Sequence, residues 1–491
     1  MKKIFFLFFW VLSLAAFGNP KGSQVPPVSI DSYLANNQLD GWFGVYAQGN
    51  KIGYCRIEFK DLRQSEMPIV EISFNMTLEM KHEEQLNRMK MKVVERFSGE
   101  SPYQFLSAVE ETLQLGEAEE KERIDIRRLS KDGQYRARIL QGGTNRSKSF
   151  KLDYDLLDFI AEDLWILGSP KVGDTFSSEL LDTELLRMIT QKSTIKDKKT
   201  GVFNGVEATY YVVSSEDEEG FAYDTVILED GTPVKLVVGG FFELRLESEK
   251  VAKKLDQPVD LFVENLVRLE GRIEDPTKVK RMVVVMDSGL GKALADAPGQ
   301  RVFPEPKGNG YRVTITSDNA KDIRVTEKEK SKALESSVSF PLKHPRIVQL
   351  AGRATRNAKS RSEKVDSLVS FVDKYLEDSY TAEPLTVLDS IKRKKGDCSE
   401  HSALFAALAR SLGIPTRVVS GLIYSEDGAF GAHAWNEVAI DGFWVPVDST
   451  WNERTTNATH IRFPVKWDGE FRAYGRLSKA RIKLIDLKTG K

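Results

Sequence analysis

Three residues in the C-terminal third of the chain have the types and spacing that a thiol-based relay needs. Cys398 directly precedes an apolar segment, His433 follows it by 35 residues (433 − 398), and Asp448 follows His433 by 15 (448 − 433). A thiol nucleophile needs a base to take its proton, and the base needs a group that orients it. The three residues therefore indicate a nucleophilic thiol with a base and an orienting group.

The cysteine is expected at the N-terminus of a helix. Apolar residues recur at helical spacing from Ser399 to Leu412, Gly413 is a typical stop signal, and Pro415 prevents a restart. Free backbone N–H groups and the helix dipole favour an anion at such an end, which predicts a lowered thiol pKa for Cys398. Gly396 would let the chain turn sharply into this helix. The predicted buried face comprises Leu404, Phe405, Leu408 and Leu412.

The histidine and the aspartate are expected on two strands of one hairpin. Residues 434–440 and 444–447 have strand character, and Asp441-Gly442 between them is a hairpin turn sequence. His433 starts the first strand and Asp448 ends the second, with an offset of two residues that a bulge or slanted register would absorb. The two side chains are thereby predicted to lie within hydrogen-bond reach.

With these elements in place, the sequence resembles the transglutaminase-like superfamily over about Ser360 to Trp451. The matching segments, in order, are GDCSEH from Gly396, LGIPTRV from Leu412, HAWNEV from His433 and DST from Asp448. The resemblance implies a papain-like α+β domain with Cys398 as nucleophile, His433 as acid and base, and Asp448 as the orienting group.

Two features depart from the family pattern. The aspartate is followed by Ser449 where proline is more usual, and no tryptophan lies between Trp165 and Cys398 to serve as an oxyanion donor. The backbone N–H of Cys398 stays a candidate for one half of an oxyanion site.

The remaining cysteine and histidines have more ordinary interpretations. Cys398 itself could be a buried apolar residue, the common fate of a free cysteine, and Cys55 in a strand-like run is predicted to fill a core, unpaired with Cys398. His401 would suit a metal pair or a rival base, but a structural zinc site needs four ligands, so a helix-surface or packed histidine is favoured. No metal or cofactor site is predicted. Three histidines without a partner pattern are predicted to be surface or core residues: His82, His344 and His460.

Composition narrows the class of protein. The 491 residues include 71 Lys and Arg against 72 Asp and Glu, a net charge of -1, which gives no electrostatic footprint for nucleic acid. Two cysteines exclude a disulfide-stapled scaffold and a Cys-rich zinc module.

The first 18 residues are predicted to be a signal peptide. Met1-Lys2-Lys3 is a basic start, residues 4–17 are uncharged, and Ala16-Phe17-Gly18 suits cleavage. An uncleaved signal anchor is the alternative. The mature chain is expected to be exported, periplasmic or secreted, with no transmembrane span after cleavage.

The chain is expected to be multidomain. Residues 19–272 are β-rich and predict an antiparallel sheet or open barrel, with a hairpin at Asp230-Gly231 and a helix within 154–167. Residues 273–340 predict a small β domain plus a linker, and residues 341–491 the transglutaminase-like domain.

The expected function is that of an exported cysteine enzyme acting on peptide or amide bonds. Hydrolysis, as a peptidase or amidase, and transamidation share one thioester intermediate, so the residues leave both open. Protein or peptide substrates are expected, including cell-envelope peptides. The alternative is a catalytically inert transglutaminase-like scaffold or binding module in the cell envelope. A third, weaker possibility is a ligand carrier, which an apolar concave pocket in residues 41–272 would support.

Overall fold

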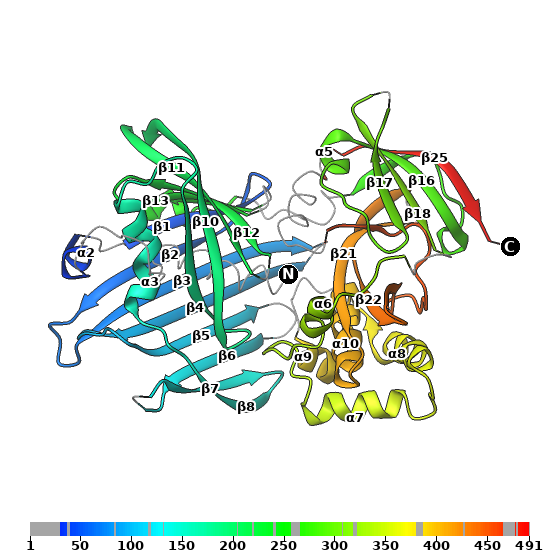
Figure 1. Cartoon of the computed structure of the whole chain (residues 1–491), viewed down its shortest axis with the longest axis horizontal. Coiled ribbons are helices and arrows are strands. Elements are labelled where there is room, and N and C mark those ends of the chain that lie inside the picture. The colour runs from blue at the N-terminus through cyan, green and yellow to red at the C-terminus, as the bar shows by residue number, and fades with distance from the viewer. Residues whose placement is uncertain are drawn as a thin grey trace. The chain divides into compact units, whose positions relative to one another are not determined.

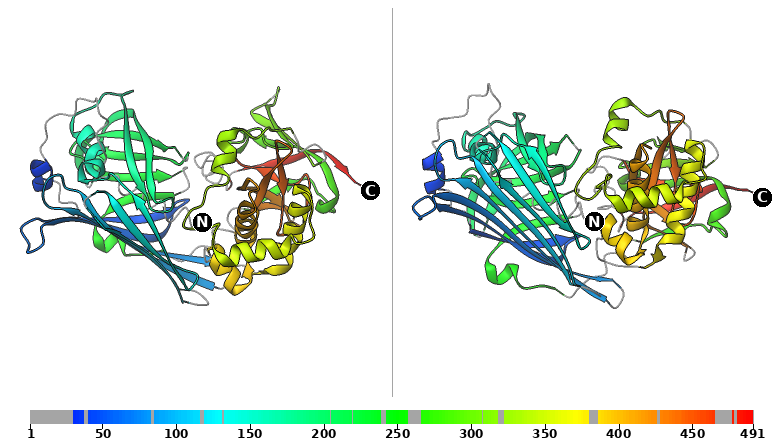
Figure 2. Two further views of the ribbon diagram at one scale, coloured as in Figure 1. Left: turned by 60° about the horizontal axis from the view of Figure 1, so that its bottom comes forward. Right: turned by 90° about the horizontal axis from the view of Figure 1, so that it is seen from below.

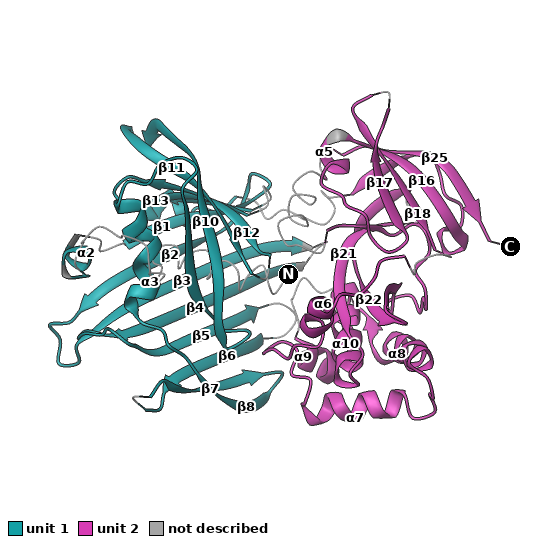
Figure 3. Cartoon of the chain, viewed as in Figure 1, with its two compact units in different colours: residues 1–260 teal, residues 261–491 magenta. Residues whose placement is uncertain are grey.

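The computed structural model consists of two compact units, residues 1–260 and 261–491 (Figure 3). The signal peptide predicted at residues 1–18 lies outside the described residues. None of the helices in the described part of the chain has the length and apolar character needed to cross a membrane. The described residues are 30–36, 40–82, 85–115, 119–130, 132–203, 205–218, 220–238, 242–256, 266–306, 308–317, 322–379, 386–425, 428–464, 477 and 480–490.

The first unit is built on one antiparallel sheet of 14 strands among the described residues, and the sheet is strongly curved (Figures 1 and 2). It runs from β8 through β7 to β1 and then from β14 down to β9, so that almost every strand pairs with its sequence neighbours. The predicted antiparallel sheet or open barrel is confirmed. The strands are β1 Asp40–Ala47, β2 Asn50–Leu62, β3 Ile69–His82, β4 Gln85–Ser98, β5 Phe105–Leu115, β6 Glu119–Arg128, β7 Gln134–Gln141, β8 Thr144–Lys151, β9 Thr175–Asp182, β10 Arg187–Phe203, β11 Val206–Asp217, β12 Ala222–Leu228, β13 Pro233–Val238 and β14 Phe242–Glu247.

Alternation of side chains decides which face of this sheet is buried. In β3 every second residue from Val70 to Met80 is buried, as the period of two in the sequence predicts. The predicted helix is α3, Leu156–Leu167, whose Ile166 packs on Ile195 and Tyr211 of the buried face. Two shorter helices are α2 Ile30–Asn36 and α4 Glu249–Ala252.

Ionisable side chains also point to this buried face. Glu95 on β4, Glu110 on β5 and Glu162 on α3 are each at most 4% exposed. Desolvation raises the pKa of Glu95 and Glu110 to about 8 and that of Glu162 to about 7. The unit therefore buries these carboxyls in a form that takes up a proton near neutral pH.

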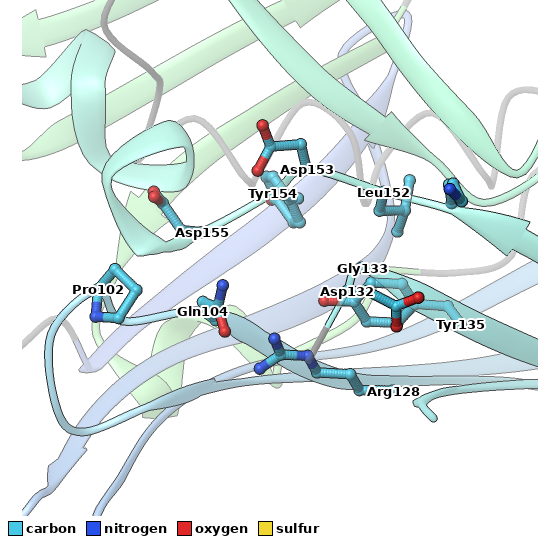
Figure 4. A pocket seen from close by; sticks show the side chains of 11 residues that line it. Pro102, Gln104, Arg128, Asp132, Gly133, Tyr135, Leu152, Asp153, Tyr154 and Asp155 are labelled. Atoms are coloured by element: carbon cyan, nitrogen blue, oxygen red, sulfur yellow. The ribbon is translucent and has the colours of Figure 1, made fainter. Parts of the chain in front are cut away.

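A pocket of about 500 Å³ opens in the first unit between the β6–β7 region and the start of α3 (Figure 4). Its lining is largely charged or polar and includes Arg128, Asp132, Lys151 and Asp153. It does not supply the apolar pocket that a carrier of apolar ligands would need.

The second unit is built on a sheet of nine strands among the described residues, in the order β17-β18-β16-β25-β15-β22-β21-β24, with β23 paired to β22. Its strands are β15 Val267–Glu270, β16 Val279–Asp287, β17 Gln300–Pro304, β18 Gly310–Thr316, β21 Thr416–Tyr424, β22 Ala429–Ile440, β23 Phe443–Val447, β24 Ile461–Arg462 and β25 Ile482–Thr489. Two further strands of two residues each, β19 Glu377–Asp378 and β20 Lys395–Gly396, pair with each other in parallel, apart from this sheet.

The strands of residues 273–340 belong to this same sheet. Pairing of β16 with the C-terminal strand β25 joins them to the strands that follow residue 415. The boundary between the two compact units follows residue 260, whereas the predicted domain boundaries lie at residues 272 and 340. Within the segment expected to be a linker, the structure has helix α6, Glu327–Lys332.

Helices cover one side of the strands β21 to β23. The buried face of α8 consists of Val365, Leu368, Val369 and Val372, and α10 packs against β22 with Leu404, Phe405 and Leu408 fully buried. The apolar face of α10 was predicted from its spacing. The helices of the second unit are η3 Pro276–Lys278, α5 Ser288–Gly291, α6 Glu327–Lys332, α7 Pro345–Ala354, α8 Arg361–Tyr375, α9 Val387–Arg393 and α10 Cys398–Ser411.

Close packing of three strands depends on Gly421 of β21. It pairs with His433 of β22 on one side and Arg462 of β24 on the other. A Cβ at this position would lie 2.0 Å from the carbonyl oxygen of Ile461 and 2.6 Å from the ring of Trp435. Only glycine lets β24 and the tryptophan approach β21 this closely.

We predict that Gly421→Ala lowers the stability of the second unit by about 1–3 kcal/mol, the usual cost of overpacking. The measurement is the thermal or urea unfolding midpoint of the full chain. Gly352→Ala is the matched control, because Gly352 is an exposed position of α7 with no neighbour within 4 Å of the added Cβ. The control should gain about 0.5–1 kcal/mol from helix propensity. Equal midpoints for Gly421→Ala and wild type would contradict the prediction.

We predict that Glu110→Gln flattens the pH dependence of stability between pH 5 and 8. In this range the unfolded carboxyl is ionised while the folded one keeps its proton, so wild-type stability falls by about 1.4 kcal/mol per pH unit for this group. Glutamine keeps an oxygen for the hydroxyl of Thr183, which donates to Glu110 at 3.1 Å.

Urea unfolding at pH 5 and pH 8 measures this slope. Glu111→Gln is the control, since this neighbour on the opposite face of β5 is only partly buried and Lys121 and Arg123 hold its pKa below the ordinary value despite desolvation. If the slope of stability against pH is the same in Glu110→Gln and in wild type, the assignment of a raised pKa to Glu110 is refuted.

Candidate active site

The helix was predicted to begin at Ser399, directly after Cys398. In the structure α10 begins one residue earlier, so Cys398 is its first residue. Asp397 caps the helix by accepting the N–H of Ser399 at 2.7 Å, and Glu400 in turn accepts the N–H of Asp397 at 3.0 Å. The chain reverses at Lys394, where φ is 57°, while Gly396 is required for space, because its Cβ would lie 2.3 Å from that of Glu400. As the first helical residue, Cys398 has an N–H without an intrahelical acceptor.

The hairpin of β22 and β23 brings His433 and Asp448 together. Its two-residue turn has φ of 52° at Asp441 and 82° at Gly442, and the register is regular from Asn436↔Val447 to Ile440↔Phe443. Since β22 starts at Ala429, His433 lies inside the strand and not at its start. If this register is extended beyond Val447, the position opposite His433 lies two residues after Asp448. The contact is therefore diagonal and needs no bulge.

The imidazole and the carboxylate form a buried hydrogen bond. His433 Nε2 lies 2.7 Å from Asp448 Oδ2, and the two residues are 5% and 0% exposed. A carboxylate accepts, so Nε2 carries a proton, and in a neutral ring held this way the lone pair lies on Nδ1. His433 is thereby held in the tautomer that can accept a proton.

Hydrogen bonds fix the start of α10 against the hairpin. Asn436 on β22 donates to the carbonyl of Ser402 at 2.9 Å, and Ser449 donates to the carbonyl of His401 at 3.3 Å. The backbone N–H of Ala434 donates to the sulfur of Cys398. The sulfur is therefore held beside the residue that follows His433 on the strand.

Asp448 accepts hydrogen bonds from other groups besides His433. Its Oδ1 accepts the N–H of Thr450 at 2.8 Å, and its Oδ2 lies 3.3 Å from Nε2 of a second buried histidine, His460. Burial raises the pKa of this carboxyl, but His433 and His460 outweigh burial and hold the pKa far below its ordinary value. Asp448 is therefore an anion throughout the neutral pH range.

Two tryptophans surround the imidazole of His433. The ring of Trp451 stacks on it with centroids 4.4 Å apart and planes at 14°, and the buried ring of Trp435 lies 6.0 Å away at 18°. Trp451 is 48% exposed and so forms the solvent side of the site. Trp435 is buried and forms the inner side.

The thiol of Cys398 does not have the lowered pKa that its place at the helix N-terminus predicted. Desolvation, and after it the charges of Asp397, Glu400 and Asp448, raise its pKa well above the ordinary value, and only the N–H of Ala434 opposes them. A raised pKa favours the thiol over the thiolate, so a base that takes the proton would assist chemistry at this atom.

His433, Asp448 and His460 are also a group that could hold a metal ion, with ligand atoms within 4.8 Å of one another. Two ligands of one tetrahedral zinc ion lie about 3.3 Å apart, given zinc–ligand distances near 2.0 Å. The 2.7 Å separation of His433 Nε2 and Asp448 Oδ2 is shorter and is that of an N–H···O hydrogen bond. The geometry favours a hydrogen-bonded cluster here.

Sequence reasoning missed two residues of this cluster. His460 was predicted to be a surface or core residue, and Trp451 was given no role. Neither residue has a spacing in the sequence that signals a site. His460 lies in the loop after Glu453, and the pairing of β24 with β21 places it beside Asp448. Of the two positions expected for His401, on the helix surface or packed, the structure has the packed one, with Nδ1 at 2.9 Å from the carbonyl of Asp397. Cys55 and Cys398, both in the described part of the chain, are unpaired.

We predict that Asp397→Asn shifts the pH midpoint of Cys398 alkylation by iodoacetamide to a lower value. The substitution removes the largest unfavourable charge at the thiol, and asparagine still caps the helix. The measurement is the alkylation rate from pH 6 to 10, with labelling located by mass spectrometry. Asp155→Asn, at the same kind of cap on α3, is the control and should leave the profile unchanged. An unchanged or higher midpoint in Asp397→Asn would disprove the effect.

Known proteins that resemble this chain include one curated relative and several solved structures. The chain is 25% identical over 155 residues to kyphoscoliosis peptidase of Mus musculus, covering 29% of this chain and 23% of that protein. The solved structures include a beta-barrel-like protein of a domain of unknown function from Brucella abortus, with 10% identity, a TM-score of 0.31, and coverage of 43% of this chain and 100% of that one. Another is a TGase, with 17% identity, a TM-score of 0.18, and coverage of 46% and 65%.

The chain thus spans less than a quarter of the length of the curated relative that it matches. The model of the transglutaminase-like superfamily matches residues 348–449, which contain α8, α10 and the hairpin of β22 and β23. Residues 348–449 are a transglutaminase-like domain.

Proposed function

We propose that the transglutaminase-like domain is a cysteine enzyme that transfers acyl groups from peptide or amide bonds. One arrangement supports this proposal above all. His433, held by Asp448 at 2.7 Å through Nε2, neighbours the residue whose N–H binds the sulfur of Cys398. Nucleophile, base and orienting group occur in the order that a Cys-His-Asp relay needs.

The first half of the reaction forms a thioester. As the sulfur of Cys398 attacks the amide carbonyl, the thiol proton passes to Nδ1 of His433. The carbonyl oxygen gains negative charge, for which the N–H of Cys398 is a donor at the helix N-terminus. His433 then gives the proton to the departing nitrogen, the carbon–nitrogen bond breaks, and the amine leaves.

The second half resolves the thioester. His433 takes a proton from the incoming nucleophile, the carbon–sulfur bond breaks, and Cys398 regains its proton. Water yields a carboxylic acid, as in a peptidase or amidase, and a primary amine yields a new amide, as in a transamidase. Proposed substrates are proteins or peptides, including cell-envelope peptides met after export to the periplasm or exterior.

We predict that His433→Ala slows alkylation of Cys398 by iodoacetamide about 100-fold or more near neutral pH, the usual contribution of a positioned base. The rate is measured on the full chain as a function of pH by mass spectrometry. Cys55 serves as an internal control, since it is fully buried and its pKa is raised by desolvation, so it should remain unlabelled in the folded chain. His344→Ala removes a histidine at the N-terminus of α7 and is the matched variant control.

Equal alkylation rates in wild type and His433→Ala would overturn the enzyme and support the binding module. If the relay is present, the two outcomes of the thioester are separated by incubation with a protein substrate and a fluorescent primary amine. New carboxyl termini in the products indicate a peptidase, and fluorescent protein indicates a transamidase. Cys398→Ala should abolish both.

A further inference from the structure

His460 occupies a place that the proposed reaction does not by itself explain. It is 4% exposed, it directly precedes β24, and its ring lies 5.8 Å from that of His433. Its Nε2 is 3.3 Å from Asp448 Oδ2, the same oxygen that accepts from His433. Its Nδ1 is 3.1 Å from the carbonyl oxygen of Asn457.

Both ring nitrogens of His460 face oxygens that carry no hydrogen. The carbonyl of Asn457 can only accept, and the carboxylate of Asp448 can only accept. A neutral imidazole has one N–H, so one contact would set a nitrogen lone pair against an oxygen lone pair in a site closed to water. An imidazolium has two N–H groups and satisfies both contacts.

We propose that His460 is a positioning residue for the relay, present as an imidazolium that donates to Asn457 and to Asp448 and supplies the counter-charge of Asp448. The inference rests on the proposed function and deepens it. It assigns to His460 the task of leaving His433 neutral, and therefore able to accept the proton of Cys398.

The charge balance of the site gives this task its physical reason. A buried carboxylate requires a cation. With His433 as its sole partner, the only cation available to Asp448 would be a protonated His433, which has no lone pair for the thiol. With His460 as the cation, the ion pair is complete, and His433 Nε2–H donates to Asp448 as a neutral group.

The surrounding chain holds His460 in this position. Asn457, whose carbonyl accepts from the ring, is fixed by Glu453, which accepts its backbone N–H at 2.8 Å and its side-chain amide at 2.7 Å. On the other side, Arg462 of β24 pairs with the buried carboxylate of Glu437 at 2.5 Å. Of the described groups, the titratable ones with a direct contact to the His460 ring are His433 and Asp448, and the aromatic rings are Trp435 and Trp451.

The protonation of His460 is tested directly by NMR of the full chain labelled with ¹⁵N-histidine, which has five histidines. We expect two ring N–H signals from His460 and one from His433, on Nε2, at pH 7. His460→Gln assigns the signals and should add a second N–H to His433. A single N–H on His460 in the wild-type chain overturns the inference, whatever the alkylation rates are.

The effect on the relay is tested by the pH profile of Cys398 alkylation. Glutamine can still donate to Asp448 from nearly the same place but carries no charge, so His460→Gln should keep the maximal rate within about threefold. It should also move the profile to lower pH, with labelling at pH 6 about tenfold faster, because Asp448 then favours the proton on His433 and the thiolate on Cys398. His460→Leu, which loses the donor as well, should lower the maximal rate about tenfold.

Controls separate the possible failures. His344→Gln should match wild type, and circular dichroism reports whether His460→Leu is folded. A loss of rate at every pH with no shift in His460→Gln would indicate packing alone and would overturn the inference. If His433→Ala labels at the wild-type rate, the proposed function falls as well, whereas a normal His433 dependence with an unshifted His460→Gln profile overturns only the role of His460.

Discussion

The charge of Asp448 is the constraint around which the catalytic end of this domain is organised. A fully buried carboxylate is costly unless donors and a cation surround it. The donors come from three places in the chain: the N–H of Thr450, His433 on β22 and His460 before β24. Every element that carries one of them must be held within hydrogen-bond distance of the others. The precision of the site therefore follows from the need to compensate one charge.

The packing of the second unit provides that precision. Gly421 lets β24 and Trp435 close on β21, which brings in His460, and Asn436 and Ser449 tie the first turns of α10 to the hairpin. The sulfur of Cys398 thus lies at the meeting point of a helix and two strands. Because burial raises the pKa of this thiol, its reactivity depends on a base that can take the proton.

The two units solve the problem of buried carboxyls in opposite ways. In the first unit Glu95, Glu110 and Glu162 lie buried, and desolvation raises each pKa to about 7 or 8, so these groups gain a proton and lose their charge. In the second unit Asp448 keeps its charge because two imidazoles face it. The difference lies in the neighbours that the fold supplies, since the side-chain chemistry is the same.

The sequence by itself determined the elements and the order of the relay. The stop at Gly413, the apolar spacing of α10 and the turn at Asp441-Gly442 are local signals, and each was sufficient because backbone preferences act over a few residues. Only the tertiary structure decided the rest: the diagonal contact of His433 with Asp448, the raised pKa of Cys398, the pairing of β25 with β16, and the position of His460 beside Asp448. These depend on desolvation and on contacts between distant segments, and no local pattern of residues encodes the neighbours that a folded chain brings together.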